Sequence, residues 1–398
     1  METKKLKLFF LFFSLVFIFR IQISFLNYIN FINKPVRNLD VKVINQYKKK
    51  NYYVLKLKNK DVTFYTTSRD NLKNLLNENL NIKILTKNIS FLGYLSSFYA
   101  ISFDLKLKNA SFLDKFIENQ HKDKKISNLY KALFLGEGID YKTRQELSTL
   151  GISHLFALSG FHLGVISFIL FLIFSPVYKI FHKKFPYRNR FFDLGILIFI
   201  FEFLYLYLTS FPPSLIRAFV MEIILFLFAF NLQNIFSLRI LFLTILASFI
   251  IFFMKIFSIG FFLSILGVFY IMLFFKYFKP TFKNGILMNF FVFLMMFVIS
   301  HTVFSNMSLY QLLSPFATIL FTFFYPLAMF LHLIGIGGIM DGIIKGYLHL
   351  GDNFYDYKLP LWFGILFLWL SLAAYYKKLS FYGINLLAFS IVLGGLFV

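Results

Sequence analysis

The chain has 398 residues, of which 59% are hydrophobic, 22% aromatic and only 15% charged, and its formal net charge is +23. A soluble globular domain carries about 25% charged residues, so this composition excludes that class. The 61 Phe residues also exclude a disordered polycation, because disordered chains are poor in aromatic residues. The sequence contains no Cys, which excludes disulfide bonds and thiolate metal sites. What remains is a polytopic α-helical membrane protein with an unusual excess of positive charge.

Part of that positive charge reflects a general bias in composition. The chain has 33 Lys but only 8 Arg, and Phe, Ile and Asn are also abundant, which is typical of an AT-rich coding sequence. The rarer residue types therefore carry more information about function. These are Arg, the Glu residues inside apolar stretches, and Gly.

The chain begins with a segment that predicts a membrane anchor. Residues 6–26 are almost entirely apolar and follow Lys4 and Lys5. The apolar stretch is longer than the roughly 7–15 residues of a typical signal-peptide core, and no small-residue cleavage site follows it. We therefore expect residues 1–33 to form an uncleaved transmembrane anchor with its N-terminus in the cytoplasm.

Residues 34–120 predict a small β-rich domain outside the cytoplasm. Hydrophobic and polar residues alternate in five runs, and residues 70–80, with helical spacing, separate the third run from the fourth. The runs are residues 41–44, 53–58, 62–66, 82–87 and 98–108. This order is that of an OB-like β-barrel, although another small β-rich module would also fit. Residues 34–110 hold 15 basic and 5 acidic side chains, a net charge of +10.

Residues 121–398 predict a polytopic membrane domain, because long apolar stretches dominate from residue 152 onward. Residues 335–350 are also apolar but glycine-rich, and they are either re-entrant or interfacial. Together with the N-terminal anchor and the spans given below, we expect about nine to eleven transmembrane helices in the chain. The basic loop at residues 179–190 then lies inside, as the positive-inside rule requires. The expected spans are residues 152–176, 191–209, 214–232, 236–254, 257–275, 286–304, 312–334, 360–375 and 380–398.

A cluster of polar residues at the start of this domain is the most unusual feature. On a continuous helix, His154, Ser159 and His162 fall within about 140° of one another, while Gly160 and Gly164 form a small-residue strip on another face. Such a helix would pack by its glycines and turn a polar arc toward a cavity. Alternatively, the histidines lie near the interface and satisfy backbone groups.

The same cluster does not match a known catalytic or metal-binding pattern. Ser159 lacks the Gly two residues before it that a nucleophile elbow requires, since Ala157 stands there. His154 and His162 lack the spacing of a zinc site. The sequence therefore predicts no catalytic residue, no metal and no cofactor.

Three charged residues lie inside apolar stretches, where a central charge costs about 2.5–3.5 kcal/mol. Glu202 and Glu222 lie at a similar depth, about 15 Å from the turn at residues 212–213. Arg217 lies nearer that turn. Two interpretations stay open: Arg217 pairs with a Glu and locks the bundle, or it lines an aqueous path and meets an anion such as phosphate.

These segments together resemble the ComEC family of competence proteins over most of the chain. The resemblance rests on Leu135-Gly136-Glu137 and on the run from His154 to Gly164, with the pattern His-Leu-x-Ala-x-Ser-Gly-x-His. Arg217-Ala218, Phe262-Leu263-Ser264 and Ser314-Pro315 follow in the family's order. Many members also carry a metallo-β-lactamase-like domain, but this sequence has no His-x-His-x-Asp-His pattern, so no nuclease activity is expected.

The resemblance implies an inner-membrane channel that passes single-stranded DNA into the cytoplasm during natural transformation. It also implies membrane lipid, a periplasmic DNA receptor and a cytosolic helicase-like motor as partners, and leaves a homo-oligomer open. In this interpretation the OB-like domain captures DNA through basic and aromatic side chains. The candidates are Lys48, Lys49, Lys50, Tyr52, Tyr53, Lys56, Lys58, Phe64 and Tyr65.

Further residues would belong to the path or to the family motif: Gly136, Glu137, His154, Ser159, Gly160, His162, Gly164 and Arg217. Glu202 and Glu222 would repel an anionic strand if both were ionised. We therefore expect them to be paired, protonated or turned away from the path. Two other functions remain alternatives: a transporter of a small anionic or saccharide-linked substrate, and a membrane enzyme that uses the His154, Ser159 and His162 cluster.

Overall fold

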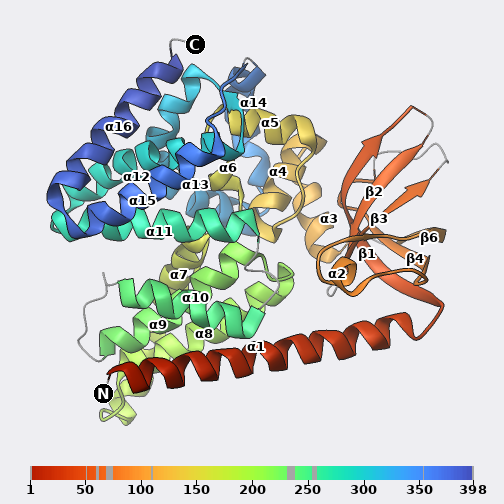
Figure 1. Ribbon diagram of the computed structural model, residues 1–398, viewed down its shortest axis with the longest axis horizontal. Coiled ribbons are helices and arrows are strands. Elements are labelled where there is room, and N and C mark those ends of the chain that lie inside the picture. The colour runs from red at the N-terminus through yellow and green to blue at the C-terminus, as the bar shows by residue number, and fades with distance from the viewer. Residues whose placement is uncertain are drawn as a thin grey trace. The chain divides into compact units, whose positions relative to one another are not determined.

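The computed structural model describes residues 2–50, 52–59, 62–68, 75–108, 111–230, 238–252, 258–352 and 354–396. The chain divides into two compact units (Figure 1). The first comprises residues 1–116 with 246–256, and the second comprises residues 117–245 with 257–398.

The first unit begins with one long helix, α1 (Glu2–Ile32), which contains a candidate membrane span at Ser14–Ile32. Arg37 fixes the end of this helix. Its guanidinium donates to the carbonyl oxygens of Phe31, at 2.7 Å, and Asn30, and it lies over the Phe31 ring at 5.1 Å. These bonds satisfy carbonyl groups that the last helical turn leaves without intrahelical partners.

A six-stranded sheet follows, with the strand order β5-β3-β2-β1-β4-β6. Alternation along the strands buries one face, where Val43, Leu55, Leu57 and Ile82 are fully buried. The strands are β1 (Val36–Lys48), β2 (Tyr53–Lys58), β3 (Thr63–Ser68), β4 (Asn79–Leu85), β5 (Phe98–Tyr99) and β6 (Ser102–Lys108).

The long strand β1 pairs with β2 through one half of its length and with β4 through the other. The segment from β5 to β6 hydrogen-bonds to two further strands. The Ala100 N–H donates to the Tyr65 carbonyl of β3 at 2.9 Å, and the Ile101 carbonyl accepts from the Leu85 N–H of β4 at 3.0 Å. Residues 98–108 therefore contact both β3, in parallel, and β4, antiparallel.

The helix expected at residues 70–80 is not borne out where the chain is described. Residues 69–74 lie outside the described residues, Leu76 and Asn77 form a turn, and residues 79–80 belong to β4. The short helix of this unit, α2 (Phe91–Leu95), follows the fourth strand instead. The reason is that Leu80 is buried in the sheet core together with Ile82 and Ile84, so a two-residue period governs this stretch.

The second unit is almost entirely helical. Two short strands, β7 (Asn306–Met307) and β8 (Tyr355–Asp356), pair with each other. Two helices, α3 and α10, cross the boundary between the units, since residues 112–116 and 246–252 belong to the first. The helices up to residue 252 are α3 (Phe112–Glu118), α4 (Lys124–Leu135), α5 (Tyr141–Thr149), α6 (Ser153–Phe156), α7 (Gly160–Lys184), α8 (Arg190–Leu208), α9 (Pro213–Phe230) and α10 (Leu238–Phe252). The later ones are α11 (Ile259–Tyr277), α12 (Phe282–Val303), η2 (Leu309–Leu313), α13 (Ser314–Leu333), η3 (Gly337–Met340), α14 (Asp341–His349), η4 (Leu350–Asp352), α15 (Leu361–Tyr376) and α16 (Lys378–Leu396).

Within the described residues, seven helices are long and apolar enough to cross a membrane, so the chain is a multi-pass membrane protein. This number is below the nine to eleven expected from the sequence. Two expected spans, 236–254 and 360–375, form shorter apolar helices, α10 and α15, and residues 335–350 form η3 and α14. The expected span at residues 214–232 forms α9 up to Phe230, which is not among the seven, and residues 231–232 lie outside the described residues. The spans are Ser14–Ile32, Gly160–Lys184, Arg190–Leu208, Ile259–Tyr277, Phe282–Val303, Leu309–Leu333 and Lys378–Gly395.

Two large apolar cores and a small one around Met307 lie among the described helices of the second unit. One large core is formed by α11, α12, α15 and α16 around fully buried Tyr270 and Phe367, and the Tyr270 hydroxyl lies 3.1 Å from Ser371 Oγ. The other large core is formed by α4, α5, α6 and α13 around Tyr130 and Tyr325. The residues of the family-like motif line this second core.

Candidate functional site

The expected continuous helix at residues 152–176 is wrong, because the chain breaks between α6 and α7. Ala157 is extended, and Ser159 is the N-cap of α7. Ser159 and His162 form a capping box, in which each side chain contacts a backbone N–H of the other residue. This local chemistry starts a new helix at Gly160, so the expected arc of His154, Ser159 and His162 does not exist on one helix.

His162 is completely buried and its δ nitrogen serves the helix start. The Ser159 backbone N–H donates to Nδ1 at 3.1 Å, and the Ser159 hydroxyl lies 3.0 Å from the same atom. The ring packs edge-on against Tyr325 with centroids 4.5 Å apart. His162 and Ser159 therefore position α7 against α13.

His154 lies apart from that pair. Its Nε2 is 3.3 Å from Thr318 Oγ1 of α13, and its side chain is exposed. Of the three polar residues expected to line a cavity, His154 is exposed, Ser159 is half-buried and His162 is buried.

Gly160 permits the close approach of α7 to α9. A Cβ atom on Gly160 would stand 3.1 Å from Ala218 Cβ and 3.3 Å from Arg217 Nη2. A Cβ on Gly164 would have no neighbouring atom within 4 Å. Of the two glycines in the expected strip, Gly160 therefore lies at a close helix contact and Gly164 does not.

Arg217 is buried, with 5% of its surface exposed, and it contacts neutral groups. Its Nε donates to Ser264 Oγ of α11 at 2.7 Å, and Nη1 lies 3.5 Å from Met221 Sδ. Among the described residues, no carboxylate forms an ion pair with it. The first alternative, a lock between Arg217 and a Glu, is thus not observed in this part of the chain.

Glu202 and Glu222 meet at the hydroxyl of Ser167. Ser167 Oγ lies 2.7 Å from Glu222 Oε1 and 3.0 Å from the Leu163 carbonyl oxygen, and it is also hydrogen-bonded to Glu202 Oε1. A hydroxyl has one hydrogen to donate, but three oxygens surround this one. At least one carboxyl group must therefore carry a proton and donate it.

Gly136 joins the two halves of the motif. It ends α4 in the left-handed conformation, with φ of 70°. A Cβ there would stand 2.7 Å from Leu158 Cδ1 and 3.7 Å from Pro212 Cγ, so a larger residue would collide with the α6–α7 break. Glu137 follows, half-buried. The segments around Gly136, Leu158 and Pro212 thus form one packed region.

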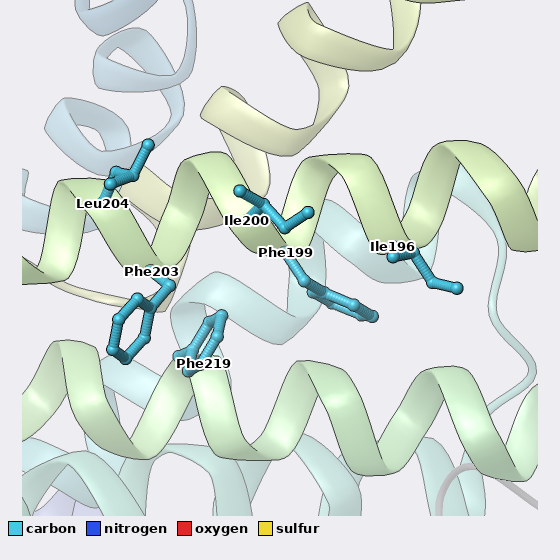
Figure 2. Close-up of a pocket in the computed structure, with 6 residues that line it drawn as sticks. All are labelled: Ile196, Phe199, Ile200, Phe203, Leu204 and Phe219. Atoms are coloured by element: carbon cyan, nitrogen blue, oxygen red, sulfur yellow. The ribbon is translucent and has the colours of Figure 1, made fainter.

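A hollow between α8 and α9 is lined by apolar side chains alone. Its volume is about 310 Å³, and Figure 2 shows Phe203 and Phe219 side by side between the two helices. Phe203 is half-exposed, as is Ile200 on the same helix. The lining residues are Ile196, Phe199, Ile200, Phe203, Leu204 and Phe219. An entirely apolar hollow cannot solvate a charged substrate, and it suits a lipid chain.

In the first unit, the candidate basic and aromatic residues divide by the alternation of the strands. Lys48, Lys49, Lys50 and Tyr52 are exposed around the β1–β2 turn. Tyr53, Lys56, Lys58 and Tyr65 are partly exposed on β2 and β3. Burial lowers the pKa of the Lys58 ammonium.

Phe64 is a correction to the expected set. It is completely buried in the sheet core and stacks on Phe98 with ring centroids 5.5 Å apart. Adjacent strand residues point to opposite faces, so Phe64 and Tyr65 cannot both be accessible platforms.

The sequence reasoning missed Tyr99. It is 56% exposed and lies directly beside Tyr65 in the parallel pairing of β3 and β5, while Lys56 lies beside Tyr65 on the other side. The Lys56 ammonium stands 5.3 Å from the Tyr65 ring centre, and the Tyr99 hydroxyl is 2.7 Å from Thr67 Oγ1. We call Lys56, Tyr65 and Tyr99 the basic–aromatic row. The signal for Tyr99 was present, since it alternates with buried Phe98.

The fold and the site together define a multi-pass helical membrane protein with a small, strongly basic sheet module. The family model described as "Competence protein" matches residues 133–394, which is most of the chain. The chain therefore belongs to this ComEC-type competence family, whose role lies in DNA uptake. Neither the curated proteins nor the solved structures that were compared include a match to it.

Proposed function

We propose that this protein is an inner-membrane channel that passes single-stranded DNA into the cytoplasm during natural transformation. Beyond family membership, the observation that carries the proposal is the buried Arg217, whose guanidinium contacts no carboxylate among the described residues. Lipid cannot solvate the phosphates of a DNA strand. A guanidinium could compensate each passing phosphate, because its planar set of N–H donors matches phosphate oxygens.

The charge of the membrane segments is consistent with this role. Ser264 and the small Gly160 leave Arg217 cationic beside neutral neighbours, so its field is not cancelled locally. The proton shared around Ser167 keeps at least one of Glu202 and Glu222 neutral, which reduces repulsion of an anionic strand. His154 adds an accessible polar group nearby in the motif.

We further propose that residues 34–120 form an OB-like extracytoplasmic domain that captures the strand. The supporting observation is the strand pairing: β1 with β2 and β4, β3 parallel to β5, and β4 with β6. OB folds bind oligonucleotides on the face of their second and third strands and at the loop between the first two. The basic–aromatic row occupies that face, and Lys49, Lys50 and Tyr52 surround that loop.

Other components would complete the process. The sequence has no Gly-x-x-x-x-Gly-Lys-[Ser/Thr] run to bind a nucleotide, so we propose that a cytosolic helicase-like motor supplies energy. A periplasmic receptor would deliver the DNA, and homo-oligomers of the chain are compatible with the proposal. No catalytic step is assigned to the chain.

The test is uptake of labelled DNA by a transformable bacterium in which this chain replaces the resident family member. We expect wild-type protein to support entry of one strand into the cytoplasm and Arg217→Ala to abolish it at equal protein level. Arg217→Lys keeps the charge but loses the planar donors, and we expect intermediate uptake. Full uptake by the Ala variant would remove Arg217 from the path. Uptake of a small anionic solute, without DNA, would favour the alternative transporter.

A further inference from the structure

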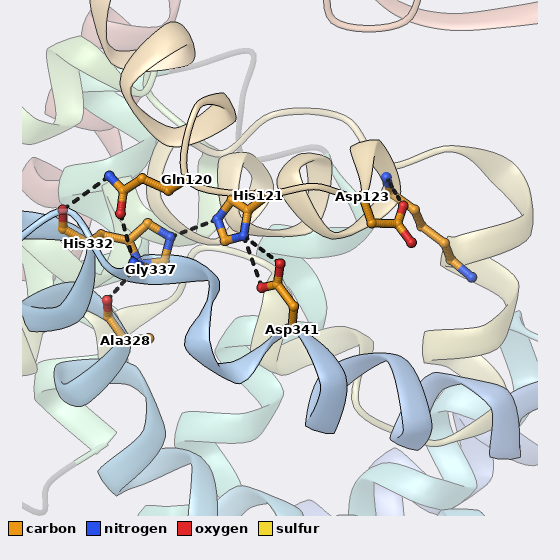
Figure 3. Close-up of polar contacts among 8 residues, drawn as sticks. Gln120, His121, Asp123, Ala328, His332, Gly337 and Asp341 are labelled. Carbon is orange, nitrogen blue, oxygen red and sulfur yellow. Dashed lines mark hydrogen bonds and ion pairs between the residues drawn. The ribbon is translucent and has the colours of Figure 1, made fainter.

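A chain of three ionisable residues lies in the second unit, beside Tyr130 of the core that the motif residues line. His121 follows α3, His332 ends α13, and Asp341 begins α14 (Figure 3). His121 Nδ1 is 2.9 Å from Asp341 Oδ1 and 3.1 Å from Oδ2, and His121 Nε2 is 3.0 Å from His332 Nε2. His332 Nδ1 is 2.7 Å from the Ala328 carbonyl oxygen. The His121 side chain is completely buried, and His332 is 4% exposed.

The hydrogens of this chain can be counted from the geometry. A carbonyl oxygen only accepts, so His332 Nδ1 must carry a hydrogen. The contact between the two Nε2 atoms needs one hydrogen, and the contact between His121 Nδ1 and Asp341 needs another. Three links therefore require three hydrogens, whereas two neutral imidazoles and a carboxylate supply two. The arrangement holds one additional proton.

The surroundings keep the three residues in place. The Tyr130 ring stacks on His121 with centroids 4.6 Å apart and lies 4.4 Å from the His332 ring. Gln120 donates to the His332 carbonyl at 3.2 Å and accepts from the Gly337 N–H at 2.8 Å. A side chain at Gly337 would collide with the His332 ring, 2.6 Å from its Cβ.

Other charged groups nearby are already paired with one another. Lys345 of α14 lies 3.3 Å from Asp123, whose pKa is lowered first by the Lys125 backbone N–H and then by Lys345. Lys131 of α4 lies 3.0 Å from Glu118. Burial raises the pKa of the Tyr130 hydroxyl, so it stays neutral. The remaining titratable side chains of α14 are Tyr347 and His349, at its far end.

No group of three or more His, Cys, Asp or Glu side chains that could hold a metal ion occurs among the described residues. Zinc binds imidazole nitrogen at about 2.0–2.1 Å in tetrahedral geometry, so a shared ion would hold two ligand nitrogens about 3.3 Å apart. The observed separation of the two Nε2 atoms is 3.0 Å, which is the length of a hydrogen bond.

We propose that Asp341, His121 and His332 form a proton-binding site that fastens residues 119–123 to α13 and α14. With the proton bound, each link has a hydrogen and the segment is held. Without it, one link joins two lone pairs in a buried place, which is repulsive. The segment then opens. The ligand is a single proton, and the inference does not depend on the proposed transport of DNA.

The experiment is hydrogen exchange, read by mass spectrometry, on the purified full-length protein in detergent at a series of pH values. Rates are corrected for the intrinsic pH dependence of amide exchange. As the pH rises and the proton leaves the site, protection of residues 119–123 should fall by about tenfold per pH unit, because one proton is linked to opening. Protection that does not change with pH would overturn the proposal.

Two variants of Asp341 distinguish a site that binds an additional proton from hydrogen bonds that need none. In Asp341→Asn the amide N–H can donate to His121 Nδ1, so all three links are satisfied by neutral rings. We expect protection that stays high and no longer depends on pH, whereas Asp341→Ala should lose protection at every pH. Loss of protection in the Asn variant equal to that in the Ala variant would contradict the proposal. If the Asn variant does not fold, NMR of the labelled histidines and of the Asp341 carboxyl group in the wild-type protein decides: finding neither an imidazolium nor a protonated carboxyl group at a pH where residues 119–123 are protected would refute the proposal.

Discussion

Gly160 and Arg217 are in direct contact across the α7–α9 interface, with only 3.3 Å between a Cβ placed on the glycine and Nη2 of the guanidinium. A side chain at the first residue of α7 would thus press on the buried guanidinium of α9. Gly160 and Gly164 look equivalent in the sequence, but the space around them differs completely, and this difference can be measured.

We predict that Gly160→Val destabilises the protein by about 1–3 kcal/mol, because the added atoms overpack a tight interface. Gly164→Ala is the matched control. Its Cβ meets nothing within 4 Å, and Ala in a helix interior is favoured over Gly by about 0.5–1 kcal/mol. Thermal unfolding of the purified proteins in detergent measures both effects. Equal destabilisation by the two substitutions would contradict the close approach at Gly160.

The shared hydroxyl of Ser167 leads to a second prediction. In Glu222→Gln the side chain is a neutral amide of similar shape, which can either donate to Ser167 Oγ or accept from it, 2.7 Å from the position of Glu222 Oε1. We expect its stability to stay within about 1 kcal/mol of the wild type, whereas Glu222→Ala removes the partner and should cost about 1–3 kcal/mol. Thermal unfolding again provides the measurement. If the Gln variant were as unstable as the Ala variant, the shared proton would be ruled out.

The basic–aromatic row predicts how the protein binds single-stranded DNA. Tyr99→Ala should weaken binding by about 1–3 kcal/mol, the usual contribution of one stacked base. Lys56→Ala should reduce the slope of log affinity against log salt by about 0.7, because one phosphate contact is lost. Fluorescence anisotropy with a labelled oligonucleotide and the full-length protein at several salt concentrations measures both.

Phe64 supplies the control for that experiment. Because Phe64 is buried in the sheet core, Phe64→Leu should lower stability while the folded protein keeps its affinity for DNA. A variant that folds normally but loses affinity would place Phe64 at the DNA and contradict the present assignment of faces.

Asp104 gives a prediction about pH. The hydrogen bond from Lys83, 2.8 Å away, lowers the pKa of this carboxyl group, and the charge of Lys106 adds to the effect. A lowered pKa means that the contribution to stability is complete above the unfolded value of about 4 and is lost as the pH falls below it. Hydrogen exchange in β4 and β6 should therefore accelerate in acid, after correction for intrinsic rates.

Asp104→Asn is the matched variant for this pH effect. Asp104 has a positive φ of 57°, a conformation that Asn tolerates about as well as Asp. The variant therefore keeps the backbone and removes the charge, so the acid-dependent part of the exchange should disappear. Retention of the full pH dependence would assign it to another group.

Much of the architecture could be predicted from the sequence because it depends on local periodicity and length. Alternation predicted the strands that became β1, β2, β3 and β6, and long apolar stretches predicted most of the spans. Periodicity could not predict the break before Gly160. That break follows from the capping contact of Ser159 with His162 and from Leu158, which Gly136 and the Ser214 hydroxyl hold from other parts of the chain.

The sequence by itself determined that this is a multi-pass membrane protein of the competence family with a basic module, because composition and a contiguous motif are local properties. Only the tertiary structure decided which polar groups meet. Glu202 and Glu222 share a hydroxyl from a third helix, Arg217 contacts neutral groups, and His121 joins His332 and Asp341 across more than 200 residues. Such contacts depend on how distant helices pack, and packing brings together side chains whose spacing along the chain carries no regular signal.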